Sequence, residues 1–320
     1  MDLTVLFSTR NGAAVLTRTL EGYVRQENPG FAWKLVVVDN GSRDETTKIL
    51  SRYDGPLRLE VLNESTAGKS RALNRGLDFA EGEVVVVTDD DAIPQPGFLA
   101  AWKEAFRREP ESSIFGGSIV PLFEAPPAGW MLRTGFHFEE LFAARINVPE
   151  GPIDPWKIYG PNMAVRRSVF SRGLRFLDNI GPNGADPDYA MGSETEFCLR
   201  AQKQGYKLWF APKPTVQHVV RPHQITPEYC AKRAYRLGRG AALQQWESGI
   251  LAPRRRSPLF RLAAVPWRAG QRSWLAIRTL RPGAFEHLEA RWNYEFYCGF
   301  QHEHARQKRL RRETAQMPPR

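Results

Sequence analysis

The chain has 320 residues, 42% of them hydrophobic and 25% charged, which is enough to bury a substantial core as one large domain or as one domain with an extension. No apolar run approaches the roughly 20 residues that cross a bilayer, and the first predicted strand begins at Leu3, so we expect neither a membrane span nor a signal peptide. The net charge of +10 implies a negatively charged partner, such as a membrane surface, a nucleic acid or an anionic substrate.

The first 90 residues alternate predicted strands with predicted helices. Apolar runs and helical periodicity predict strands at 3–9, 34–38, 57–62 and 83–88, and helices at 13–26, 44–53 and 71–80. This alternation at short spacing is typical of a parallel sheet built from β-α-β units. The sequence therefore predicts an α/β fold with helices flanking a mostly parallel sheet.

The next 150 residues continue this pattern less regularly. They predict strands at 114–120, 160–165 and 206–211, and helices at 96–108, 193–205 and 227–240. Between the first of these strands and the second lies an irregular segment, residues 124–155, that is rich in proline, glycine and aromatic residues. We expect such a segment to shape a binding site rather than the core.

Polar clusters follow three of the predicted strands at the point where each strand ends. They are Thr9-Arg10-Asn11, Asp39-Asn40-Gly41-Ser42 and Asp89-Asp90-Asp91. In open α/β sheets the ligand site lies outside the carboxyl ends of the strands. Three neighbouring carboxylates repel one another unless a cation neutralises them, so the third cluster predicts a divalent metal with a phosphate on its far side.

A second acidic cluster, Ser193-Glu194-Thr195-Glu196, opens a predicted helix after a glycine-rich loop. A carboxylate in the first turn, such as Glu194, can take a proton from an incoming hydroxyl. Acidic residues are also favoured at helix N-termini by the helix dipole, with Ser193 as an N-cap. The cluster alone leaves both interpretations open.

Taken in order, five short motifs resemble the inverting family 2 glycosyltransferases of the GT-A fold. The resemblance covers roughly residues 3–245. The motifs are Thr9-Arg10-Asn11, Val37-Val38-Asp39-Asn40-Gly41-Ser42 with Asp44, Gly68-Lys69-Ser70-Arg71 through Gly76, Thr88-Asp89-Asp90-Asp91 and Gly192-Ser193-Glu194-Thr195-Glu196-Phe197.

The resemblance implies a nucleotide-diphosphate sugar donor and a bound Mn²⁺ or Mg²⁺. The residues that it assigns to the nucleotide sugar are Thr9, Arg10, Asn11, Asp39, Lys69, Arg71, Asp89 and Asp90. Asp91 would bind the metal. His218, which follows the last predicted strand, would complete the metal shell or form a hydrogen bond in the floor of the domain.

The same resemblance implies a catalytic base and an acceptor region. The family usually has Gly-Glu-Asp where this chain has Gly192-Ser193-Glu194, so Glu194 is expected to be the base, with Glu196 as the fallback. Asn162 and Trp156 are expected to contact the acceptor, a saccharide or a polyprenyl-linked molecule. The predicted chemistry is a single displacement in which a hydroxyl attacks the anomeric carbon and the configuration inverts.

The last hundred residues carry the basic excess. Residues 1–220 contain 25 basic and 28 acidic residues, whereas residues 221–320 contain 20 and 7. Arginine and tryptophan alternate with aliphatic residues in 254–281, which favours an anionic membrane surface; packing onto the catalytic domain is the alternative, and nucleic acid is less favoured. Residues 301–320 are polar and are expected to fray.

These observations together predict a GT-A-type catalytic domain at 1–220 and a basic, mostly helical extension at 221–320. The nucleotide-sugar half would span about 1–120 and the acceptor half about 121–220. Three scattered cysteines, without metal-ligand spacing, favour a reducing compartment, so we expect the protein in the cytoplasm, peripheral on the inner face of the membrane. The alternatives are a nucleotidyltransferase on a related sheet and a non-catalytic module that binds sugar nucleotides or a membrane surface.

Overall fold

The computed structural model describes residues 1–26, 29–133, 136–184, 186–247 and 285–316. The chain divides into two compact units. The first comprises Met1–Pro126, His137–Ala185 and Ser193–Arg221, and the second comprises Pro127–Phe136, Asp186–Gly192 and Pro222–Arg320. The expected division at residue 220 stays a prediction, and the predicted membrane-contacting segment 254–281 lies outside the described residues.

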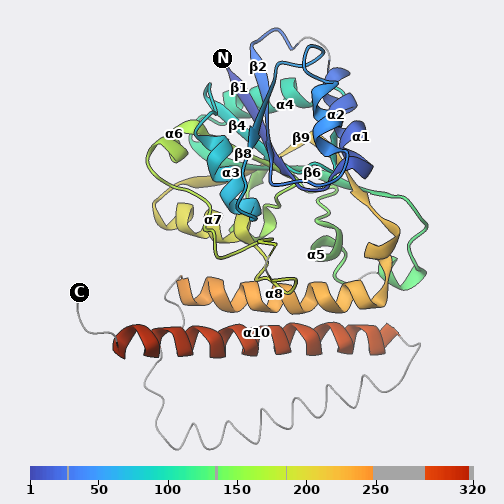
Figure 1. Cartoon of the computed structure of the whole chain (residues 1–320), viewed down its shortest axis with the longest axis vertical. Coiled ribbons are helices and arrows are strands. Elements are labelled where there is room, and N and C mark those ends of the chain that lie inside the picture. Colours follow the sequence, from blue (N-terminus) through green and yellow to red (C-terminus); the bar gives the residue numbers. More distant parts are fainter. Residues whose placement is uncertain (27–28, 134–135, 185, 248–284, 317–320) are drawn as a thin grey trace, which may run out of the picture. The chain divides into compact units, whose positions relative to one another are not determined.

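A nine-stranded sheet forms the centre of the first unit, in the order β3-β2-β1-β4-β8-β6-β9-β5, with β7 paired to β9 (Figure 1). Strands β1 to β4 pair in parallel, whereas β8 runs antiparallel to both β4 and β6. The strands are β1 Leu3–Thr9, β2 Trp33–Asp39, β3 Leu59–Asn63, β4 Val84–Thr88, β5 Ala92–Pro94, β6 Ser112–Phe123, β7 Gly151–Pro152, β8 Asn162–Arg166 and β9 Lys207–Val220.

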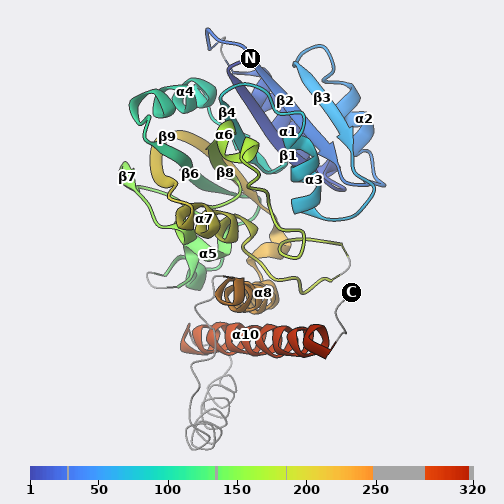
Figure 2. The ribbon, with the colours of Figure 1, turned by 90° about the vertical axis from the view of Figure 1, so that its left-hand side faces the viewer.

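Helices cover both faces of this sheet, as the second view shows (Figure 2). Those of the first unit are α1 Ala13–Val24, α2 Thr46–Ser51, α3 Lys69–Leu77, α4 Phe98–Arg108, α5 Phe138–Phe142, α6 Arg167–Ser171 and α7 Ser193–Lys203. Side chains of α1, α2 and α4 pack in one buried cluster, and those of α3, α6 and α7 pack in another. The predicted α/β class with a helix-flanked sheet is therefore confirmed.

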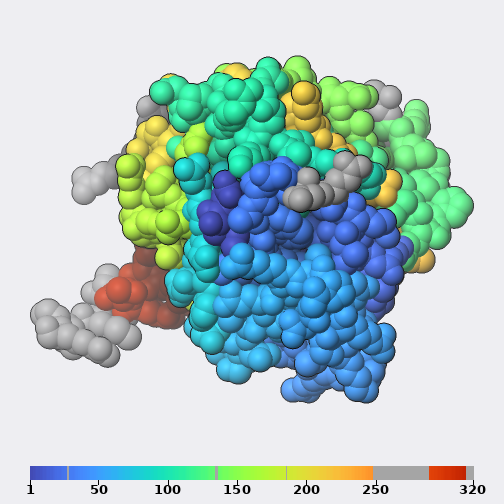
Figure 3. Space-filling model, turned by 90° about the horizontal axis from the view of Figure 1, so that it is seen from above, coloured from blue at the N-terminus to red at the C-terminus, as the bar shows by residue number. Residues whose placement is uncertain are grey.

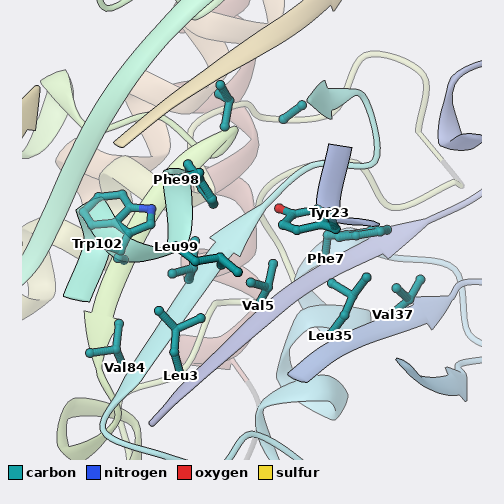
Figure 4. Close-up of a cluster of buried hydrophobic side chains, with 14 of the residues drawn as sticks. Leu3, Val5, Phe7, Tyr23, Leu35, Val37, Val84, Phe98, Leu99 and Trp102 are labelled. Atoms are coloured by element: carbon teal, nitrogen blue, oxygen red, sulfur yellow. The ribbon is translucent and has the colours of Figure 1, made fainter. Parts of the chain in front are cut away.

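The four valines of β4 show why the sheet is buried on both sides. Val84 and Val86 belong to the cluster with α1 and α4, and Val85 and Val87 belong to the cluster with α3. All four are buried, so each contributes roughly 1.5–3 kcal/mol of apolar transfer energy. Figure 4 shows the first cluster, in which Trp102 of α4 lies beside the strand residues.

The space-filling view shows the first third of the sequence, blue to teal, forming a continuous surface (Figure 3).

The second unit is built on two helices, α8 Pro227–Glu247 and α10 Phe285–Gln316, which lie side by side (Figures 1 and 2). Glycines let the two backbones approach closely. A Cβ added at Gly238 would overlap the carbonyl of Phe296, and one added at Gly299 would overlap the carbonyl of Tyr235. No helix in the described part of the chain is both long and apolar enough to span a bilayer.

The expectation that residues 301–320 fray is wrong as far as Gln316, because α10 continues to that residue. Glu303, in this half of the helix, is fully buried and accepts hydrogen bonds from Arg239, Arg306 and Gln307. Arg311 lies over the ring of Trp246. Arg239 and Trp246 belong to α8, about 60 residues away in the sequence, so local composition could not indicate these two contacts.

Candidate active site

The carboxyl ends of β1, β2 and β4 bring the three polar clusters to one edge of the sheet. The register pairs Thr9 with Asp39, and the N–H of Asn40 donates to the carbonyl of Thr9 at 2.8 Å. β4 lies on the other side of β1 and ends at Thr88, directly before the aspartates. The predicted gathering of polar side chains at this edge is therefore present in the structure.

Thr9 and Asp90 join two of these strand ends. The hydroxyl of Thr9 donates to Oδ2 of Asp90 at 2.6 Å. Gly12 allows this approach, because a Cβ there would overlap both side chains. Burial raises the pKa of Asp90 to about 7, and the charge of Asp91 adds to this, whereas the hydrogen bond from Thr9 opposes it. Burial thus favours the protonated form of Asp90.

Asp39 and Asn11 shape the loops around this edge. Both carboxylate oxygens of Asp39 accept internal hydrogen bonds, from the N–H of Ser42 at 2.9 Å and the hydroxyl of Thr47 at 3.1 Å, and the residue is buried. Asn11 adopts a φ of 54°, and its side-chain oxygen accepts from the N–H of Arg43 at 2.8 Å. Both residues thus fix the conformation of the loops at this edge.

The two predicted donor-binding arginines contact the loop that precedes α7. A Cβ added at Gly184 would overlap the guanidinium of Arg10, so Arg10 lies directly against this glycine. Arg71 pairs with Asp178 at 2.9 Å, and both side chains are about half exposed, at 46%. Neither arginine reaches the aspartate trio through a hydrogen bond or ion pair within the described residues.

Asp91 and His218 lie together because β5 pairs with β9. The register places Ala92 opposite His218, and the N–H of Val219 donates to the carbonyl of Asp91 at 2.9 Å. Nε2 of His218 is 3.5 Å from Oδ1 of Asp91, and Nη2 of Arg221 is 3.6 Å from Oδ2. Two predicted metal-site residues that are 127 positions apart in the sequence are therefore neighbours.

The imidazole of His218 is oriented as in many metal sites. Nδ1 lies 2.9 Å from the carbonyl oxygen of Phe142, which can only accept, so Nδ1 carries the proton and Nε2 faces Asp91. Burial lowers the pKa of His218, but the carboxylate of Asp91 more than offsets this, and the pKa lies above its ordinary value. Burial raises the pKa of Asp91, but His218 and Arg221 outweigh it and lower the pKa.

These residues fit a Mn²⁺ or Mg²⁺ ion that is held partly by a substrate. Among the described residues, no three His, Cys, Asp or Glu side chains form a complete metal cage. Mg²⁺ is usually held by one or two carboxylates together with substrate phosphates. The carboxylate of Asp91 and Nε2 of His218 supply such an incomplete set.

Lys69, Asp89 and Glu194 form the second half of the site. Nζ of Lys69 lies 2.5 Å from Oδ1 of Asp89 and 3.4 Å from Oε1 of Glu194. Burial of the ammonium lowers the pKa of Lys69, but these two carboxylates outweigh it and raise the pKa. Oε1 of Glu194 also lies against Gly160, where a Cβ would overlap it. Glu194, at the start of α7, therefore reaches the residues that follow β4.

Glu196 is held apart from this group. Its side chain is only 2% exposed. The guanidinium of Arg200 donates hydrogen bonds to both carboxylate oxygens, to Oε2 at 2.7 Å. The same guanidinium donates to the carbonyl of Arg175 at 2.7 Å. The structure brings Glu194 to the aspartate edge and leaves Glu196 in a buried ion pair within α7.

The two predicted acceptor residues have opposite surroundings. Asn162, at the start of β8, is fully buried, and its amide donates to the carbonyls of Ser118 at 2.8 Å and Pro214 at 3.0 Å. Trp156 is 53% exposed. Asn162 therefore ties strands together, while Trp156 offers an aromatic face to solvent.

Sequence reasoning missed two contributors to the site, Gly160 and the carbonyl of Phe142. Gly160 leaves room for the carboxylate of Glu194, and its signal was a glycine directly before Pro161 at the start of a predicted strand. The carbonyl of Phe142 fixes the orientation of His218, and no side-chain pattern signals a backbone acceptor.

Comparisons with known proteins agree with this geometry. The family model described as Glycosyl transferase family 2 matches residues 4–174. A glucosyl-dolichyl phosphate glucuronosyltransferase from Haloferax volcanii is 23% identical over 210 residues, which cover 63% of this chain and 64% of that protein. Glycosyltransferase AglE from the same organism is 24% identical over 261 residues, covering 79% of this chain and 77% of AglE.

A solved structure shows the same fold. The mannosyltransferase PcManGT from Pyrobaculum calidifontis, in complex with GDP-Man and Mn²⁺, superposes with a TM-score of 0.59 at 22% identity, covering 96% of this chain and 87% of that one. The chain spans less than two thirds of the length of the first curated relatives that it matches, 64% and 49% for the first two. The fold of the first unit is thus of the GT-A type.

Proposed function

Since the chain belongs to family 2 of the glycosyltransferases, we propose that it moves a sugar from a nucleotide-diphosphate sugar to a hydroxyl of a saccharide or lipid-linked acceptor, with inversion at the anomeric carbon. The observation that carries this proposal is the placement of Glu194 within 3.4 Å of Lys69, which in turn contacts Asp89 at the strand edge. A base and a donor-binding edge are thereby adjacent, as a single displacement requires.

In this proposal, Glu194 accepts the proton of the acceptor hydroxyl. The hydroxyl oxygen then bonds to the anomeric carbon from the face opposite the diphosphate, and the bond from that carbon to the diphosphate breaks. Glu196 does not serve as the base, because Arg200 holds its carboxylate in a buried pair. The exposed face of Trp156 is the surface that we assign to a sugar of the acceptor.

Asp91 and His218 are the residues that would hold Mn²⁺ or Mg²⁺. When bound, such an ion stabilises the negative charge of a leaving diphosphate as a Lewis acid. The His218 imidazole is already oriented for this by the carbonyl of Phe142. Thr9 and Asp90 together fix the neighbouring strand ends against which the nucleotide would lie.

The acceptor proposal rests on the relatives and on charge. One relative is named for a dolichyl phosphate substrate, so a lipid-linked acceptor suits this chain. The basic excess in residues 221–320 suits an anionic membrane surface. We therefore place the enzyme on the cytoplasmic face of a membrane, attached peripherally.

A thermal-shift screen of nucleotide sugars, with and without Mn²⁺, tests the donor proposal. A donor that binds the folded state stabilises it by mass action and therefore raises the melting temperature. At a donor concentration a hundredfold above Kd, the free energy of unfolding rises by about 2.7 kcal/mol. We expect a rise with one class of nucleotide sugar that depends on Mn²⁺ and is lost in Asp91→Ala. No rise with any sugar nucleotide would contradict the proposal.

A further inference from the structure

Lys69 connects the donor edge of the site to the base. Its ammonium lies between Asp89, at 2.5 Å, and Glu194, at 3.4 Å, and the three side chains are 20%, 20% and 16% exposed. Contacts of this kind are charge-assisted and are little screened when they are this far from solvent. Within the described residues, Lys69 is the only cation that forms an ion pair with Glu194.

The backbone of Lys69 is fixed from both sides, so its side chain starts from a defined position. Its N–H donates to the carbonyl of Pro182 at 2.8 Å, and the hydroxyl of Ser70 donates to the carbonyl of Ile180 at 3.0 Å. On the preceding residue, the N–H of Gly68 donates to Oδ1 of Asn40 at 2.7 Å. The side chain of Lys69 therefore extends from a fixed backbone toward Asp89 and Glu194.

The two contacts of this ammonium differ in strength. The contact with Asp89 has the length of a strong charge-assisted hydrogen bond, whereas that with Glu194 is about 1 Å longer. The short contact fixes the ammonium against Asp89, and from that position the ammonium reaches the carboxylate of Glu194.

We propose that Lys69 is a positioning residue whose ammonium holds the carboxylate of Glu194 at the strand edge, where an acceptor hydroxyl would meet it. Without this ion pair the carboxylate loses the contact that fixes it beside Asp89, and a misplaced reacting group lowers the rate. This inference rests on the proposed function, because it needs Glu194 as the base.

A double-mutant cycle on kcat tests the inference. The variants are Lys69→Met, Glu194→Gln and their combination, each assayed at saturating donor so that weaker donor binding does not enter. If Lys69 acts through Glu194, the two losses are not additive. We expect Lys69→Met to lower kcat about tenfold or more in the wild-type background and less than about twofold in the Glu194→Gln background.

Two further variants serve as a rescue and as a control. Lys69→Arg keeps the charge, and we expect it to recover part of the lost kcat; it also provides the same cycle if the methionine variant does not fold. Arg75→Met removes an exposed charge from the same helix and is expected to leave kcat unchanged.

Equal losses from Lys69→Met in both backgrounds would overturn the inference, because Lys69 would then act independently of the base. That outcome leaves the proposed function intact as long as Glu194→Gln alone is severely impaired. Full activity of Glu194→Gln would instead remove the base assignment and the inference with it.

Discussion

The acidic residues of this site differ less in kind than in the partners that surround them. Glu194 and Glu196 are two positions apart in α7, yet one faces Lys69 and Gly160 while the other is enclosed by Arg200. The resemblance put Glu194 first, with Glu196 as the fallback, but it gave no physical reason for that order. Arg200 is four residues beyond Glu196 in the same helix, whereas Lys69 and Gly160 come from distant segments, so only the tertiary contacts show what surrounds Glu194.

At the residue scale, we expect Glu196→Gln to lower mainly the stability and Glu194→Gln to lower mainly kcat. Glu196→Gln breaks a buried ion pair whose arginine is 28% exposed, so we expect a loss of about 1–2 kcal/mol in stability and nearly unchanged kcat. Thermal melts and steady-state kinetics on both variants check this. A larger loss of kcat from Glu196→Gln than from Glu194→Gln would reverse the assignment of the base.

Gly160→Ala tests whether the space beside Gly160 positions the carboxylate of Glu194. The added methyl group would overlap Oε1 of Glu194 and displace the carboxylate, and a shift of about 1 Å at a reacting group can cost on the order of a hundredfold in rate. We expect kcat to fall by about 10- to 100-fold with donor affinity retained. Gly129→Ala is the matched control, because a Cβ there meets open space. Equal kinetics for the two variants would show that Gly160 does not seat the base.

At the scale of elements, strands were easier to predict than the contacts between them. β1 was predicted with its observed bounds, and β4 within one residue, because their apolar runs are continuous and end in polar clusters. The pairing of β5 with β9, which brings His218 to Asp91, was not predictable, because β5 has only three residues. The helical continuation of α10 was missed because it depends on packing against α8.

The ion pair between α8 and α10 predicts a pH dependence of stability. Burial raises the pKa of Glu303, but hydrogen bonds from Gln307, Arg239 and Arg306 outweigh this and hold the pKa below the ordinary glutamate value of 4.5. A depressed folded-state pKa stabilises the fold above the unfolded value, and this contribution is lost as the pH falls through the lower folded value.

Melting curves between pH 7 and pH 3 should therefore show wild-type stability falling below about pH 4.5, on the acidic side of the ordinary carboxylate range. Glu303→Gln should be less stable at pH 7 and should lose less on acidification. Parallel curves for the two proteins would mean that Glu303 contributes nothing to the acid sensitivity.

At the scale of the whole molecule, charge is the property that composition predicted most directly. The net charges of −3 for residues 1–220 and +13 for residues 221–320 follow from residue counts alone. We expect the full chain to sediment with vesicles that contain anionic phospholipid, with binding that weakens as salt rises, because each basic residue near the surface contributes about 1 kcal/mol. Replacing Arg254, Arg255 and Arg256 by glutamine should reduce the binding. Binding that is the same for neutral and anionic vesicles would contradict an electrostatic attachment.

The central claim is that Glu194 removes the proton of the acceptor during sugar transfer, and it is tested most directly by the turnover of Glu194→Gln with saturating donor and Mn²⁺. General-base catalysis contributes on the order of 10²–10⁴-fold, so we predict a loss of kcat in that range while calorimetry shows the donor Kd within about threefold of wild type. Wild-type turnover by this variant would contradict the account.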